Sequence, residues 1–249
     1  MTVLKTRGEI DLMDQANRIV HQVLDAMDEM IAPGVTPRQL NRHAEQVIRG
    51  AGAVPAFLHY RGYPATLCIS VNDVIVHGIP NDVPLRDGDI AGIDCGVAYK
   101  GYYGDAARTF AVGRIDEGSH RLLQVTREAL LLAVEQVRPG ARLSDIGHAV
   151  QRHAESHGFS VVREFSGHGI GTSMHEDPQV PNFGEPGKGP KLRPGLVLAI
   201  EPMVNAGTAA VKMDPDGWTA RTEDGSRSAH FEYSVAVTDQ GAQVLGIQA

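Results

Sequence analysis

A chain of 249 residues can bury a full hydrophobic core, and 42% hydrophobic with 21% charged residues is typical of a globular enzyme. The formal net charge of −7 argues against nucleic acid as the main partner, so we expect no direct sequence-specific nucleic-acid binding. No apolar run approaches ~18 residues, which excludes a membrane-spanning helix. Two cysteines, Cys68 and Cys95, cannot build a disulfide framework, so we expect a reducing compartment and a cytoplasmic protein.

The first half of the chain predicts two helices followed by extended segments. Apolar residues recur at helical spacing over residues 9–30, and Pro33-Gly34 ends the pattern. Thr36 is expected to cap a second helix, with Pro37 in its first turn and Gln39 completing a capping box. Residues 66–76 and 89–112 then have the apolar character of strands.

The second half repeats this order. Apolar spacing predicts a helix over about residues 122–137, and Ser144 can cap another that ends near residue 158. Strand-like segments follow at 161–164, 196–201 and 231–238. We therefore predict an α/β (α+β) fold and one catalytic domain over residues 1–249, with pseudo-repeats at about 9–112 and 117–246. Coincidence is the alternative, because Pro-Gly after a helix is common.

Asp94 and Asp105 are predicted to point to one face of a β-hairpin. A two-residue turn at Lys100-Gly101 places Asp94 opposite Ala107, two residues from Asp105. The two carboxylates are then diagonal neighbours, about 7–8 Å apart at the backbone. They repel each other unless cations lie between them, and a metal pair about 3.5–4 Å apart would suit this geometry. The alternative is a salt bridge to a nearby arginine, Arg108 or Arg114.

Two more acids occur in apolar strands. Glu201 ends the apolar segment 196–200, and Glu232 shares a strand face with Ser234 and Ala236. A carboxylate in such a setting is costly unless it is paired or coordinated. One such glutamate is unremarkable, but four acids in apolar strands indicate bound cations.

Three histidines have contexts that suggest a role. His168 lies between glycines, His175 follows seven residues later, and His77 ends a predicted strand. A bend must separate His168 from His175 if both serve one site, because their odd spacing puts them on opposite faces of a straight strand. Four carboxylates and one imidazole suit Mn, Fe, Co or Zn with a shared water. The other histidines, including His21 and His230, receive no role.

Together these residues and their local context resemble the type I methionine aminopeptidases of peptidase family M24, in the short bacterial form. The resemblance covers about residues 6–246. It implies the pita-bread fold, with pseudo-twofold αα-ββ halves around a central antiparallel sheet. The segments that carry it are Cys68-Ile69-Ser70-Val71-Asn72, His77-Gly78-Ile79-Pro80, Gly104-Asp105, Gly167-His168-Gly169-Ile170-Gly171, His175-Glu176-Asp177-Pro178 and Ala199-Ile200-Glu201-Pro202.

The resemblance also implies a site for two divalent ions. Asp105 and Glu232 would bridge both ions, Asp94 would complete the second site, and His168 and Glu201 would hold the first.

Three of the residues would take part in catalysis. His77 would contact the scissile amide and His175 would hydrogen-bond the developing oxyanion. Glu201 would carry a proton from water to the leaving amine.

A methionine pocket is implied at positions that match its wall in the family. Phe57 and Met174 depart from the family pattern, which often has cysteine and phenylalanine there, but they keep the wall apolar. Core packing is the alternative role for the aromatic residues. The pocket residues are Phe57, Tyr60, Tyr63, Cys68, Met174 and Trp218. The resemblance further implies a monovalent cation, Na or K, near Asn72, Val74 and Ser228.

Other members of the fold are the competing interpretations. The nearest is an Xaa-Pro aminopeptidase or prolidase, although these usually carry a large N-terminal domain, and this chain starts at the first helix. The type II enzymes carry an insertion after the second histidine, for which there is no room before Ile200. A non-catalytic binding protein would typically have lost ligands.

The resemblance implies removal of the initiator methionine from nascent proteins and peptides with a small second residue. We expect peptide N-termini as the partners, and the ribosome as another through surface charge. A monomer is expected because the two halves already bury each other's sheet face.

Overall fold

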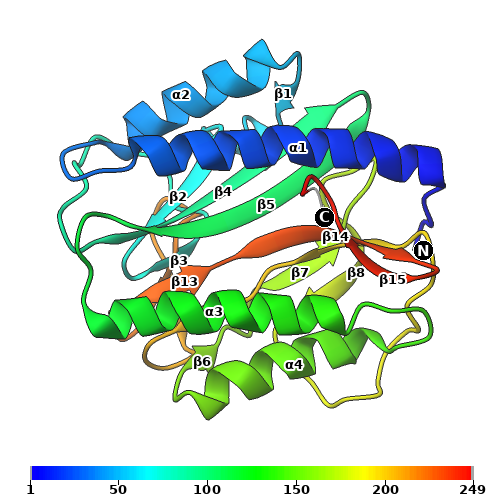
Figure 1. Ribbon diagram of the computed structural model, residues 1–249. Coiled ribbons are helices and arrows are strands. Elements are labelled where there is room, and N and C mark those ends of the chain that lie inside the picture. The colour runs from blue at the N-terminus through cyan, green and yellow to red at the C-terminus, as the bar shows by residue number, and fades with distance from the viewer. Residues whose placement is uncertain (1, 248–249) are drawn as a thin grey trace.

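The computed structural model describes residues 2–247 (Figure 1). Its helices are α1 (Arg7–Met30), α2 (Pro37–Gly50), α3 (Glu117–Glu135) and α4 (Leu143–Ser156), with a 3-10 turn at η1 (Tyr60–Gly62). The strands are β1 (Val54–Pro55), β2 (Leu67–Val71), β3 (Val74–Val76), β4 (Ile90–Tyr99), β5 (Tyr102–Ala111), β6 (Ser160–Val161), β7 (Ser166–Gly169), β8 (Glu176–Pro181), β9 (Val197–Ile200), β10 (Met203–Asn205), β11 (Val211–Met213), β12 (Ala220–Thr222), β13 (Ser228–His230), β14 (Glu232–Thr238) and β15 (Gly241–Val244).

A curled nine-stranded sheet forms the centre, and its strands pair antiparallel in the order β1-β4-β5-β14-β9-β7-β8. Strand β2 pairs with β4, and β15 pairs with β14. Two small sheets, β13-β10-β6 and β11-β12-β3, lie beside it. The predicted mixed α/β class and central antiparallel sheet are therefore confirmed.

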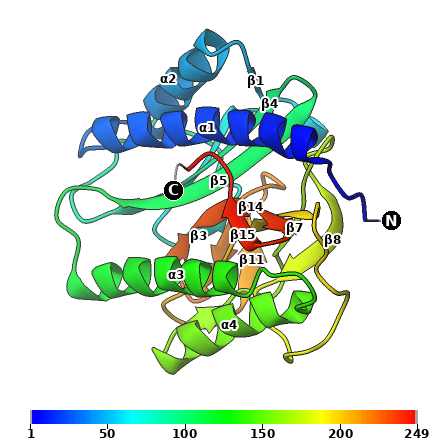
Figure 2. The same cartoon turned by 45° about the vertical axis from the view of Figure 1, so that its right-hand side comes forward.

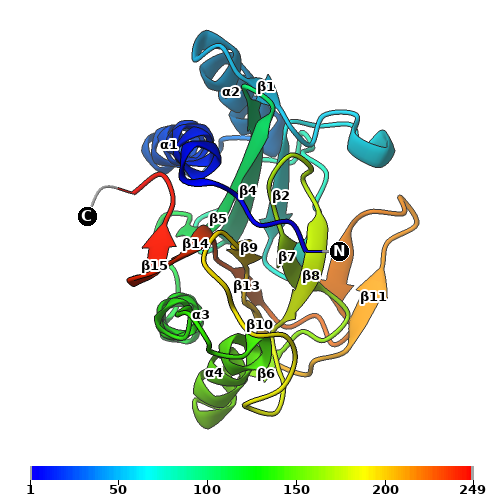
Figure 3. The ribbon, with the colours of Figure 1, turned by 90° about the vertical axis from the view of Figure 1, so that its right-hand side faces the viewer.

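The helices cover one face of the central sheet, as the end view in Figure 3 shows. Helices α1 and α2 bury Val20, Leu24 and Leu40 in a core that includes Ile93 of β4 and Phe110 of β5. Helices α3 and α4 form a second core with β9 and β14. Strand β15 lies between α1 and α3 (Figures 1 and 2). The opposite face of the sheet is left for the residues of the predicted site.

Of the two helix caps that the sequence predicted, one is confirmed and one is not. Thr36 and Gln39 form the predicted capping box of α2. Ser144 is not the cap of α4, and that prediction was wrong. An isolated bridge to Lys191 holds Arg142 extended, so the helix begins at the next residue and the backbone N–H of Arg142 donates to Asp145. The Ser144 hydroxyl donates instead to the carbonyl of Lys188.

The extended segments differ from prediction at their ends. A turn at Asn72-Asp73 divides residues 66–76 into β2 and β3. The strand predicted at 161–164 was wrong beyond Val161, because Arg163 and Glu164 form a bend. Strands β7 and β8 were not predicted, since glycine and polar residues give them no apolar alternation. Among residues 2–247, the helices lack either the length or the apolar character needed to cross a bilayer.

Candidate metal centre

Neighbouring strands bring the predicted acids to one face of the sheet. The hairpin β4–β5 has the predicted register, with Tyr99 opposite Tyr102 and Asp94 opposite Ala107. Glu232 of β14 lies on the other side of Ala107, so Asp94, Ala107 and Glu232 form one row across three strands. Asp105 is two residues along β5 from that row and shares its face, because side chains alternate along a strand.

His168 and Glu201 complete the cluster from β7 and the end of β9. His168 pairs with Ala199 of β9, and Glu201 directly follows that strand. The Nε2 atom of His168 lies 3.7 Å from Asp105 Oδ2 and 3.7 Å from Glu201 Oε1. Ligand atoms of Asp105, His168 and Glu232 all lie within 4.8 Å of one another. The structure thus gathers all five predicted ligands.

Buried carboxylate oxygens in this cluster lack protein partners. Asp94 Oδ1, Asp105 Oδ1 and Glu232 Oε1 are buried without a hydrogen bond to any described residue. Buried polar atoms are normally satisfied, and carboxylate oxygens are particularly costly to bury alone. A donor set of four carboxylates and an imidazole satisfies these atoms by coordinating divalent ions, so the residues fit such a group.

The pKa values of these acids also indicate that the site holds positive charge. Burial raises the pKa of Asp94 to about 7, and burial followed by the neighbouring carboxylates raises the pKa values of Asp105 and Glu232 well above their ordinary range. Burial opposes ionisation of Glu201 too, but the neighbouring His230 and His168 lower its pKa overall. Ionising all four acids together therefore requires added positive charge.

His230 is a site residue that sequence reasoning missed. It is buried at the end of β13, and its Nε2 lies 3.4 Å from Glu201 Oε2. Its backbone N–H and carbonyl are both hydrogen-bonded to the Thr109 hydroxyl of β5. The only signal in the sequence was that His230 lies two residues before Glu232, because two residues so close in the chain can reach the same site.

The two auxiliary histidines lie beside the cluster. The ring of His175 is 4.2 Å from that of His168 between centroids, and Tyr60 Oη lies 2.9 Å from its Nδ1. The backbone between β7 and β8 supplies the expected bend. Although part of His175 reaches solvent, desolvation of its ring and the neighbouring His168 lower its pKa to about 4. His77 packs edge-on against Trp218, and burial lowers its pKa.

All six predicted pocket residues belong to one cluster of side chains. Phe57, Tyr63, Cys68 and Met174 are buried in it, with Tyr60 and Trp218 partly buried around them. A Cβ at Gly96 would lie 2.4 Å from Met174 Cε and 2.5 Å from Phe57 Cε1, so even alanine at this position would force these side chains to move. Cys68 pairs with Asp94 across β2 and β4, which places the cluster next to the carboxylates.

The three residues predicted near a monovalent cation also lie close together. The backbone N–H of Ser228 donates to the Asn72 carbonyl at 2.9 Å. Asn72 has a positive φ of 55°, and Val74 lies on β3, which contacts the strand of Ser228.

Comparison with known proteins identifies the family of this site. The profile described as "Metallopeptidase family M24" matches residues 11–239. A protein named methionine aminopeptidase from Clostridium perfringens is 50% identical over 245 residues, which are 98% of each chain. This chain belongs to the methionine aminopeptidases of family M24. The methionine aminopeptidase 1 of Bacillus subtilis is 47% identical over 98% of this chain and 99% of its own.

Solved structures agree with this assignment. The methionine aminopeptidase of Rickettsia prowazekii has a TM-score of 0.98 and 41% identity, covering 99% of this chain and 100% of that one. A prolidase from Pyrococcus furiosus has a TM-score of 0.81 and 25% identity, and the match covers 100% of this chain but 66% of the prolidase. The pita-bread fold is thereby confirmed, and the proline-specific alternative is less well supported.

Proposed function

We propose that this metallopeptidase removes the N-terminal methionine from peptides and nascent proteins whose second residue is small. The observation that carries the proposal is a cluster of four carboxylates and His168, with Asp105 and Glu232 buried, directly beside a cluster of apolar and aromatic side chains. Full-length identity of 50% to a methionine aminopeptidase supports the same substrate.

Two divalent ions, of Mn, Fe, Co or Zn, would be held by the carboxylate cluster. We assign Asp105 and Glu232 as the ligands shared by both ions, Asp94 to the second ion, and His168 with Glu201 to the first. The close approach of His168 to both Asp105 and Glu201 supports this division. When bound, such ions supply a water of lowered pKa and polarise the scissile carbonyl.

The protein groups around that carbonyl would move the protons and stabilise charge. His175 is neutral near pH 7 because its pKa is lowered to about 4. If the Tyr60 hydroxyl donates to Nδ1, the other ring nitrogen carries its proton and can donate to the oxyanion. His77 would contact the scissile amide. Glu201, which stays ionised, would accept the proton of the attacking water and deliver it to the leaving amine.

The pocket would receive the methionine side chain of the substrate. An unbranched thioether fits a wall of aromatic and sulfur-containing side chains. Met174 and Phe57 pack against Gly96, which supports a role for them in the depth of the pocket. Tyr60, Tyr63, Cys68 and Trp218 would form the remaining wall.

Several broader features remain proposals. The adjacent backbone at Asn72, Val74 and Ser228 would hold a sodium or potassium ion through carbonyl oxygens. Each half contributes a helix pair and a core of its own, which supports one catalytic domain with pseudo-repeats at about 9–112 and 117–246. Residues 1 and 248–249 of the predicted domain lie outside the described residues. A monomer that acts on nascent chains in the cytoplasm, in contact with the ribosome, completes the proposal.

Substrate choice distinguishes this function from its nearest rival. The metal-loaded protein is incubated with Met-Ala-Ser, Met-Leu-Ser and Ala-Pro-Ala, and the released amino acids are quantified. Release of methionine mainly from Met-Ala-Ser is expected. Release of alanine from Ala-Pro-Ala, without methionine from Met-Ala-Ser, would assign the chain to the proline-specific enzymes instead.

A further inference from the structure

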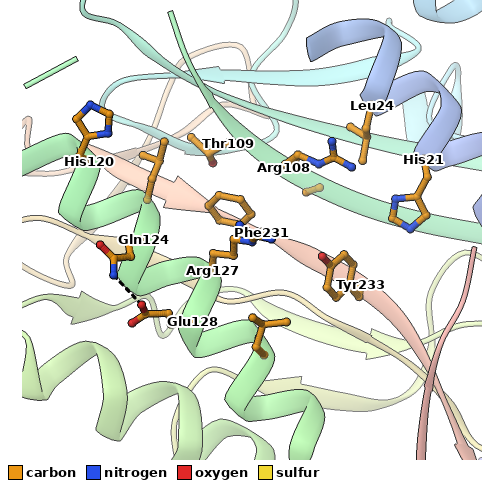
Figure 4. Close-up of a pocket in the computed structure, with 13 residues that line it drawn as sticks. His21, Leu24, Arg108, Thr109, His120, Gln124, Arg127, Glu128, Phe231 and Tyr233 are labelled. Atoms are coloured by element: carbon orange, nitrogen blue, oxygen red, sulfur yellow. Dashed lines mark hydrogen bonds between the residues drawn. The ribbon is translucent and has the colours of Figure 1, made fainter. Parts of the chain in front are cut away.

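A cavity of about 800 Å³ lies on the helix-covered face of the sheet (Figure 4). Its walls come from α1 and α3, and its floor from β5 and β14. Tyr233 and Phe231 line the floor, whereas Glu232 between them points to the metal centre, because successive side chains of a strand face opposite ways. The cavity is therefore separate from the metal centre, and its volume is within the usual range for small-ligand sites.

The cavity has a local excess of positive charge in a protein whose net charge is −7. Arg108 and Arg127 are its arginines, and Glu128 is its one acid. Arg108 is paired with Asp25 outside the cavity at 3.1 Å. Glu128 accepts a hydrogen bond from the Gln124 amide at 2.8 Å and lies 2.9 Å from Nε2 of His153 in α4. Arg127, within the part of the chain that the structure describes, makes no ion pair or hydrogen bond.

Other polar groups of this cavity also lack partners. His21 is 8% exposed, and its Nε2 has no hydrogen bond to any residue among 2–247. Its ring lies edge-on to that of Tyr233, with centroids 6.0 Å apart. The Tyr233 hydroxyl likewise has no hydrogen bond within the described chain. The Tyr233 hydroxyl is therefore an unused donor in the same cavity as Arg127, and together they match an acceptor-rich anionic group.

An apolar surface lies next to the free arginine. Leu131 is 45% exposed and follows Arg127 by one turn of α3, so both side chains are on one helix face. That face is opposite the rings of Phe231 and Tyr233, as Figure 4 shows for the labelled residues. A flat apolar group can therefore lie between the helix and the strand while a charged group reaches Arg127.

We propose that this cavity binds a small organic anion with a flat ring, of the class of aromatic carboxylates and aromatic phosphate monoesters. Arg127 binds the charged group, with a hydrogen bond from Tyr233. The ring packs between Leu131 and the aromatic floor.

Calorimetric titration of the metal-loaded protein tests this site. The probes are phenyl phosphate, phenylacetate and inorganic phosphate, which separate the two anionic groups and the contribution of the ring. Anions can also bind metal ions, so the variant Arg127→Gln is compared with Arg152→Gln, which changes an exposed arginine of α4 that has no ion pair within residues 2–247. Melting temperature and Met-Ala-Ser cleavage are expected to be the same in both variants and the parent.

We expect a ring-bearing anion to bind the parent and Arg152→Gln equally, and Arg127→Gln at least about tenfold more weakly, as for loss of one charge-assisted interaction. Inorganic phosphate should bind more weakly than phenyl phosphate. Absence of binding by both ring-bearing anions, or equal affinity for all three proteins, would overturn the proposal. Binding of phenyl phosphate alone or of phenylacetate alone would support it and identify the preferred anionic group.

Discussion

Replacing Lys5 with methionine is expected to loosen the loop that carries His175. Lys5 Nζ lies 2.5 Å from Glu176 Oε2, and the two side chains are only 3% and 13% exposed. The backbone N–H of Lys5 donates to the Gly195 carbonyl at 2.7 Å, which fixes the N-terminal segment to the loop that precedes β9. The second oxygen of Glu176 accepts from the N–H of Ser173 at 3.2 Å. The ion pair therefore joins the N-terminal segment to the His175 loop.

The expected loss in the free energy of unfolding follows from the burial of this ion pair. Removing one partner of a buried ion pair costs about 3–5 kcal/mol. Glu176 retains its hydrogen bond with Ser173 and some solvent contact, so we expect about 2–3 kcal/mol for Lys5→Met. Complete loss of an oxyanion donor lowers kcat by about 10²–10³-fold. Partial displacement of His175 should lower kcat for Met-Ala-Ser by about tenfold, with a smaller change in KM.

A double-mutant cycle measures this coupling. Urea unfolding and peptide cleavage are compared for Lys5→Met, Glu176→Gln, the double variant and the control Arg7→Met, which changes an exposed residue nearby. The double variant should be less destabilised than the sum of the single variants. A Lys5→Met protein within about 0.5 kcal/mol of the parent, with the same kcat, would refute the reasoning.

Further outcomes follow from the site and the core. Glu232→Gln should raise the melting temperature of the metal-free protein, because it removes a buried carboxylate, and should abolish the rise caused by Mn(II); an unchanged metal response in calorimetry would exclude Glu232 as a ligand. His230→Ala should lower kcat/KM about 10–100-fold and shift the acidic limb of the pH–rate profile to higher pH. The shift is expected because burial raises the pKa of Glu201 and His230 opposes this effect. An acidic limb at the same pH as in the parent would contradict that role. Gly96→Ala should raise KM for Met-Ala-Ser and cost about 1–3 kcal/mol of stability by overpacking the pocket, whereas parent-like kinetics would show that the pocket yields. Burial lowers the pKa of His21 in the folded state, so unfolding takes up a proton below about pH 6.5. The urea midpoint of the parent should therefore fall between pH 7.5 and pH 5.5, and that of His21→Leu should fall less. Equal pH dependence of the two midpoints would refute this assignment.

Local sequence rules predicted the parts of the fold that depend on local chemistry. The turn at Lys100-Gly101 specified the register that places Asp94 opposite Ala107, and the capping box at Thr36 marked a helix start. They failed where distant contacts decide the conformation. Arg142, held by a bridge to a distant loop, caps α4 in place of the predicted serine.

The site, too, could be predicted from the sequence only where it depends on local structure. Alternation along one hairpin brought Asp94 and Asp105 together, but pairing of β14 with β5 is a long-range contact that spacing cannot give. The proposed sharing of Glu232 between two ions and the proposed role of each ligand therefore rest on the resemblance to the family. His230 was missed because its role depends on its short distance from Glu201, a contact that forms only in the folded chain.

Metal-dependent methionine release tests the central claim most directly. The protein is stripped of metal, Mn(II) is restored anaerobically in steps, and methionine freed from Met-Ala-Ser is measured for the parent and for Asp105→Asn. We predict that the parent is inactive without metal and regains activity as Mn(II) is added, while the variant stays inactive. Methionine release by the stripped parent, or equal recovery by Asp105→Asn, would contradict the account.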